Sequence, residues 1–216
     1  TETTGLDPAT GDRVIEIAAL ELVGDLPTGR AFHVLLDPQR DVPEEASRVH
    51  GFTIDDLRGK PLFADKAAEF LEFIGEDPLI AHNARFDFGF LNAELKRAGR
   101  QPLDMARMVD TLDMARARFP GMPNSLDALC RRFGVDLSAR TTHNALLDCR
   151  LLAEVYVELM GGRQHGLGLV AEGEQAPAVV YDGPAERRIV RVSPSAAELA
   201  AHAGFVEQLK DPIWNS

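Results

Sequence analysis

The order of strand-like and helix-like segments constrains the fold of this chain more than any other feature. Residues 14–22 and 31–36 are apolar and strand-like, and the turn residues Gly24 and 27–29 between them predict a hairpin. A short buried strand is predicted at 78–82, between helical segments. Hairpin strands followed by strand–helix alternation predict an α/β fold, with a mixed central sheet flanked by helices.

Apolar residues recurring near every 3.6 positions mark the helices. In the segment after 78–82, for example, Phe86, Phe90, Leu91 and Leu95 share one stripe, and the pattern stops at Gly99. The other predicted helices cover residues 63–74, 111–118, 125–133 and 142–160.

Composition changes after Met160, where a Gly-rich stretch with few large apolar residues begins. We therefore predict a domain boundary near residue 161, with a globular domain over 1–161 and a flexible linker and tail over 162–216. Within the tail, Ser195 and Glu198 form a capping-box pattern that predicts one more helix.

Three motifs carry the chemistry: the opening Thr1-Glu2-Thr3-Thr4-Gly5, then His82-Asn83-Ala84-Arg85-Phe86-Asp87, and His143-Asn144-Ala145-Leu146-Leu147-Asp148. Glu2 falls at a strand end, Asp87 one turn into a helix and Asp148 within a helix. Hard divalent cations such as Mg²⁺ or Mn²⁺ require converging carboxylates. Two such cations about 3.5–4 Å apart activate water and neutralise a phosphodiester during hydrolysis. The pattern predicts Glu2, Asp87 and Asp148 as catalytic metal ligands.

His143 precedes Asp148 by five residues. On an α-helix this spacing places two side chains about 140° apart, so His143 must reach the site from the helix entrance if Asp148 points into it. A neutral imidazole with a pKa near ~6.5 suits removal of a proton from metal-bound water.

Together the motifs resemble the DEDDh family of 3′–5′ exonucleases, which is named for four acidic ligands and one histidine. The resemblance implies a ribonuclease H-like fold and His143 as the general base. In that family an Asp directly precedes the residue matching Thr1, so we expect this Asp and most of the first strand before Thr1 in the native protein. The residues expected to bind the terminal nucleotide are Thr3, Gly5, Glu45, His50, Asn83 and Phe86.

Some of these residues have structural alternatives. Thr3 and Gly5 would also suit an ordinary strand-ending turn, and Phe86 would suit the core. His50 and His82 would each serve as hydrogen-bonded structural histidines, and His82 is left out of the predicted site.

Residues 124–130, 140–143 and 151–156 resemble the epsilon family of proofreading subunits of bacterial DNA polymerase III. This resemblance implies a hydrolase that removes mispaired nucleotides from a DNA 3′ end, with a tail that binds the polymerase catalytic subunit. Trp214 is the expected anchor on that subunit. Gln164, Leu167 and Leu169 resemble a weak peptide that docks on the sliding clamp.

The net charge of −11 contrasts with the basic face of proteins that grip duplex DNA alone. The motifs favour an explanation in which metal ions and a partner supply the missing positive charge. No apolar run reaches membrane-spanning length, no signal peptide precedes the first motif in the given sequence, and the two cysteines lie in helix-like patterns. We therefore expect a cytoplasmic protein with no membrane contact.

Two alternatives stay open at this point. A free-standing RNA or oligonucleotide exonuclease of the same family would have no use for the long tail. A non-catalytic polymerase-interaction subunit would keep the fold for assembly and is favoured by an opening motif without its first Asp.

Overall fold

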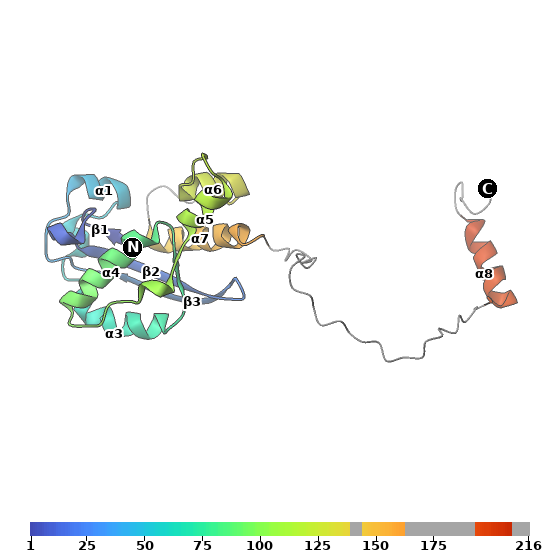
Figure 1. The fold of residues 1–216 in the computed structure, drawn as a ribbon, viewed down its shortest axis with the longest axis horizontal. Coiled ribbons are helices and arrows are strands. Elements are labelled where there is room, and N and C mark those ends of the chain that lie inside the picture. The colour runs from blue at the N-terminus through green and yellow to red at the C-terminus, as the bar shows by residue number, and fades with distance from the viewer. Residues whose placement is uncertain (139–143, 163–192, 209–216) are drawn as a thin grey trace. The chain divides into compact units, whose positions relative to one another are not determined.

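The computed structural model describes residues 1–138, 144–162 and 193–208. The chain divides into two compact units, Thr1–Gly168 and Leu169–Ser216, and each is described by itself. The first unit contains strands and flanking helices (Figure 1), which confirms the α/β class. Its elements are β1 (Glu2–Thr3), η1 (Pro8–Thr10), β2 (Val14–Val23), β3 (Leu26–Leu35), α1 (Glu44–His50), α2 (Ile54–Leu57), α3 (Phe63–Ile74), β4 (Leu79–Ala81), α4 (Ala84–Arg97), η2 (Met105–Arg107), β5 (Met108–Asp110), α5 (Thr111–Arg118), α6 (Leu126–Phe133) and α7 (Ala145–Leu159).

The strands pair both antiparallel and parallel, but in two small sheets instead of one. Strands β1, β2 and β3 form an antiparallel sheet, in which Glu2 pairs with Glu16. Strands β4 and β5 pair in parallel, with Ala81 opposite Asp110. Residues of both β2 and β4 line one cavity. The predicted pairing of the opening segment with the strand at 14–22 is confirmed, since β1 pairs with β2.

The hairpin between β2 and β3 turns more tightly than predicted. Gly24 and Asp25 have φ values of 57° and 64° and alone form the turn, since Val23 already pairs with Leu26. Positive φ at both central residues suits the twist of a two-residue hairpin. Extending the loop through residues 27–29 was therefore wrong. Pro27 is tolerated in β3 because β3 is an edge strand of its sheet.

Two hydrophobic clusters stabilise this unit. The first lies between the hairpin and helices α3 and α4, where the rings of Phe32 and Phe70 are 5.6 Å apart. The second joins α5, α6 and α7 through residues such as Leu129 and Val155, both wholly buried. Each buried side chain of this size contributes about 1.5–3 kcal/mol. Figure 1 shows the two groups of helices on opposite sides of the hairpin.

Most predicted helices are confirmed, with small changes at their ends. Helix α7 begins at Ala145 instead of 142, because Asn144 has extended backbone and its side chain accepts a hydrogen bond from Leu147 N–H at 3.0 Å. The prediction that 162–216 is a flexible tail falls largely outside the described residues.

In the second unit, α8 (Ala196–Val206) begins at the predicted Ser195–Glu198 capping box. Among the described residues, no helix combines the length and apolarity needed to cross a bilayer.

Candidate active site

Three predicted carboxylates line one cavity. Glu2 comes from β1, Asp87 from the first turn of α4 and Asp148 from the first turn of α7. All three, together with Phe86, line a cavity of about 1010 Å³. The fold thus brings acids from three distant segments of the sequence to one place.

The carboxylates influence one another electrostatically. Burial raises the pKa of Glu2 to about 7, with further raising contributions from Glu16, Asp148 and Asp87. The hydroxyl of Thr1 donates to Asp87 Oδ1 at 2.8 Å. A nearby cation would stabilise the ionised form of clustered and partly buried carboxylates such as these.

Within the described parts of the chain, no group of three or more His, Cys, Asp or Glu side chains forms a ready-made metal site. The donor set nevertheless fits a hard divalent cation, since the cavity contributes carboxylate oxygens, and burial together with the neighbouring carboxylates raises the pKa of Glu2. Glu2, Asp87 and Asp148 are the residues of this cavity that would hold such an ion.

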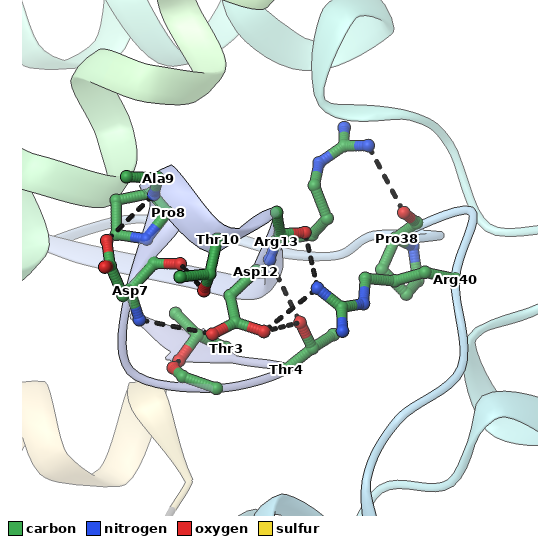
Figure 2. A network of polar contacts seen from close by, with 12 residues as sticks. Thr3, Thr4, Asp7, Pro8, Ala9, Thr10, Asp12, Arg13, Pro38 and Arg40 are labelled. Atoms are coloured by element: carbon green, nitrogen blue, oxygen red, sulfur yellow. Dashed lines mark hydrogen bonds and ion pairs between the residues drawn. The ribbon is translucent and has the colours of Figure 1, made fainter.

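A polar network fixes the backbone that follows Glu2 (Figure 2). Thr4 is wholly buried, and its N–H donates to Arg13 O at 2.9 Å while its hydroxyl accepts from Arg13 N–H at 3.0 Å. The Asp12 carboxylate accepts from Arg40 Nη1 at 2.9 Å and from the N–H of Asp7 at 3.2 Å. The turn after β1 is thereby held against β2.

Gly5 is required by this network. A Cβ at Gly5 would lie 2.2 Å from Asp12 Oδ2, closer than two such atoms can approach. Gly5→Ala must therefore displace the Asp12 carboxylate. We expect this variant to lose about 1–3 kcal/mol of unfolding free energy, the usual cost of overpacking, and to lose the hydrolytic activity that the sequence predicts, because the turn shifts.

Thermal unfolding and a nuclease assay check this prediction against Gly89→Ala as the matched control. Gly89 lies within α4, and a Cβ there meets nothing within 4 Å. Alanine at Gly89 should therefore stabilise the chain by about 0.5–1 kcal/mol. Equal thermal midpoints for the two variants would show that the Asp12 contact does not constrain Gly5.

Comparison with known proteins identifies the family. The family model described as exonuclease, RNase_T, matches residues 1–156. The chain belongs to this exonuclease family. It is 47% identical over 215 residues to the DNA polymerase III subunit epsilon of Rickettsia conorii, covering 97% of this chain and 94% of that protein.

Solved structures share the exonuclease fold. Exonuclease X in complex with 5′ overhanging duplex DNA matches with a TM-score of 0.59 and 25% identity, over 74% of this chain and 87% of that one. The nuclease domain of 3′hExo, a DEDDh family member bound to rAMP, matches with a TM-score of 0.60 and 16% identity, over 71% and 83%. These matches confirm the predicted ribonuclease H-like, DEDDh-type fold.

The remaining predicted residues of this exonuclease differ in their surroundings. Thr3 is buried and its hydroxyl donates to Gly5 O at 2.6 Å, while Asn83 is exposed at the start of α4 in a left-handed conformation. Glu45 is an exposed residue of α1. The cavity is not lined by Thr3, Gly5, Glu45 or Asn83. Their predicted contacts with nucleotide stay predictions.

The histidines also have distinct environments. His50 is buried, and its Nδ1 accepts from Phe52 N–H at 3.1 Å, a contact that fits the structural alternative. His82 lines the cavity, with Nδ1 2.9 Å from Thr111 Oγ1, and burial lowers its pKa. His143 lies outside the described residues, as do the predicted partner-binding residues Gln164, Leu167, Leu169 and Trp214.

Two acidic residues beside the site were missed by the sequence patterns. Glu16 is wholly buried in β2, and Asp110 ends β5. The sequence did contain a signal for Glu16, because it is a single acidic residue between Ile15 and Ile17 in an otherwise apolar segment. No comparable signal marks Asp110, because a strand of three residues has no readable period.

Proposed function

We propose that this chain is the 3′–5′ proofreading exonuclease subunit of a bacterial DNA polymerase III, releasing nucleotides from mispaired DNA 3′ ends. The observation that carries the proposal is the 47% identity to a DNA polymerase III subunit epsilon over 97% of the chain. The three carboxylates on one cavity support the hydrolytic chemistry.

Glu2, Asp87 and Asp148 would hold two divalent cations, Mg²⁺ or Mn²⁺. When bound, these ions neutralise the phosphoryl oxygens, lower the pKa of water and stabilise the leaving alkoxide. His143 accepts the proton of the attacking water as the P–O3′ bond breaks and a nucleoside monophosphate leaves.

Thr3, Gly5 and Asn83 hold the backbone and sugar of the terminal nucleotide, and Phe86 contacts its base. The lining of the cavity by Phe86, next to Asp87, supports this role. His50 and Glu45 contact the same nucleotide. Selectivity needs little base readout, because a mispaired terminus frays and reaches the site as single strand.

The polymerase catalytic subunit binds the tail, residues 162–216, through Trp214 and the apolar side of α8. In α8, Leu199 and Phe205 are 56% and 58% exposed, which supports a surface for a partner. Gln164, Leu167 and Leu169 add a weak contact with the sliding clamp. These partners hold the duplex and compensate for the net charge of −11.

A direct test uses the full-length protein, which includes the Asp expected before Thr1. Its substrates are single-stranded oligonucleotides labelled at either end. We expect stepwise release of single nucleotides from the 3′ end of DNA. Endonucleolytic products, or digestion of RNA in preference to DNA, would contradict the proposed function and favour the free-standing RNA exonuclease.

Metal dependence gives a second prediction. Activity should vanish in excess chelator and return with Mg²⁺ or Mn²⁺, because carboxylates are the proposed ligands. Zn²⁺ should support activity poorly, since no Cys/His cluster of structural-zinc spacing occurs in the sequence. Full hydrolysis in excess chelator would rule out the two-cation mechanism.

A further inference from the structure

Two carboxylates outside the proposed ligand set lie at the starts of the two helices that carry Asp87 and Asp148. Glu16 and Asp110 belong to strands β2 and β5, and each accepts a hydrogen bond from the first residue of one of these helices. In both cases the proposed ligand follows three residues later, within the same first turn.

Glu16 connects the antiparallel sheet to α7. Its Oε2 accepts from Ala145 N–H at 3.2 Å, and its Oε1 lies 2.7 Å from His33 Nε2 on β3. Glu16 is wholly buried, so the carboxylate is confined between these partners. It also pairs across the sheet with Glu2. One side chain thus sets the start of α7 relative to the strand that carries Glu2.

Asp110 connects the parallel sheet to α4. Its Oδ2 accepts from Ala84 N–H at 2.9 Å, while its Oδ1 accepts from Asn83 N–H at 3.0 Å and from Leu112 N–H at 2.9 Å. Asn83 has φ 68° and ψ 49°, a left-handed conformation that Asn tolerates better than most non-glycine residues. The carboxylate holds this turn in place and caps α5 at the same time.

Helix N-termini have unpaired N–H groups and a partial positive charge, so a carboxylate fixed there defines where the first turn begins. We propose that Glu16 and Asp110 are positioning residues, which set Asp148 and Asp87 for metal binding without being ligands themselves. The inference rests on the proposed function. Losing a group that orients a metal ligand usually costs on the order of 10-fold to 100-fold in metal affinity or activity.

Two substitutions at Glu16 separate position from charge. Glu16→Gln removes the negative charge, yet its amide oxygen can still accept from Ala145 N–H while its amide nitrogen faces His33. Glu16→Leu has similar volume and leaves Ala145 N–H without its acceptor. A positioning role predicts a mild effect for the first variant and a large one for the second.

At Asp110, serine is the informative replacement. Serine is a good N-cap, so Asp110→Ser should keep the cap of α5, but its shorter side chain cannot reach Ala84 N–H on α4. Asp104→Ser is the matched control, because within the described residues the Asp104 side chain makes a local contact, accepting from Ala106 N–H, two residues away, at 2.9 Å.

The test measures Mn²⁺ binding to full-length protein by calorimetry, together with thermal unfolding and the kcat and KM for single-stranded DNA. We expect Glu16→Leu and Asp110→Ser to bind Mn²⁺ about tenfold or more weakly and to lose kcat, with KM within threefold. Glu16→Gln and Asp104→Ser should bind within threefold of the unsubstituted protein. If Glu16→Leu does not fold, the Mn²⁺ affinity of Asp110→Ser alone tests the positioning role.

Unchanged Mn²⁺ affinity in Asp110→Ser would overturn the inference. A loss in Glu16→Gln as large as that in Glu16→Leu would also overturn it, because the charge would then matter instead of the hydrogen bond. Failure of the unsubstituted protein to bind Mn²⁺ would instead contradict the proposed function.

Discussion

Asp148→Ala in the full-length protein is expected to abolish tight Mn²⁺ binding, whereas His143→Ala should retain it and lose only turnover. Asp148 lines the cavity with Glu2 and Asp87 and raises the pKa of Glu2, which supports its role as a ligand. Removing a ligand should cost more than the roughly 100-fold upper range for a group that merely orients one.

His143→Ala should lower kcat by about 10²–10⁴-fold, the usual contribution of a positioned general base. Calorimetry with Mn²⁺ and single-turnover kinetics measure the two quantities. Glu154→Ala, at an exposed position on the same helix, controls for general effects on α7. Equal Mn²⁺ affinities in the Asp148 and His143 variants would refute this division of roles.

Removing residues 163–216 should leave hydrolysis of single-stranded DNA nearly intact and abolish association with the polymerase. The hydrophobic clusters of the first unit use residues up to Leu159, so the nuclease core should fold without the tail. Size-exclusion chromatography with the polymerase catalytic subunit, and an assay on single-stranded DNA, check both halves of the prediction.

Smaller substitutions sharpen the result. Trp214→Ala alone should weaken polymerase binding by about 2 kcal/mol, roughly thirtyfold in Kd, if Trp214 is an interface anchor. Substituting Gln164 and Leu167 should weaken only clamp contact, mainly when polymerase is present, since tethering strengthens a weak peptide. Undiminished polymerase binding by the truncated chain would place the interface on the globular domain.

The strongly patterned parts of the fold could be predicted from sequence. Helix α3 matches its predicted range, because its buried residues Phe63, Ala67, Phe70 and Ile74 recur at helical spacing. Strand β5 and helices α1 and α2 have three to seven residues and were not predicted, because so short an element has no readable period. Strand β4 is as short as β5 but was predicted from the apolar run at 78–81. Such elements depend on tertiary contacts.

Some residues of the candidate site could likewise be predicted from the sequence, and others could not. Glu2, Asp87 and Asp148 could be predicted to converge because each lies in a motif of several residues, and in the fold all three line one cavity. Glu16 and Asp110 have no surrounding motif. Their importance depends on which backbone N–H groups they meet across 129 and 26 residues of sequence, and only the fold reveals that.

We propose that this exonuclease removes mispaired nucleotides at a carboxylate-bound metal site. The most direct measurement compares the rates at which full-length protein releases a mispaired and a paired 3′ nucleotide from the same primer–template in Mn²⁺, with Asp148→Ala as the control. We expect faster release of the mispaired nucleotide and none by the variant. Equal rates for the two termini, or undiminished release by Asp148→Ala, would contradict the account.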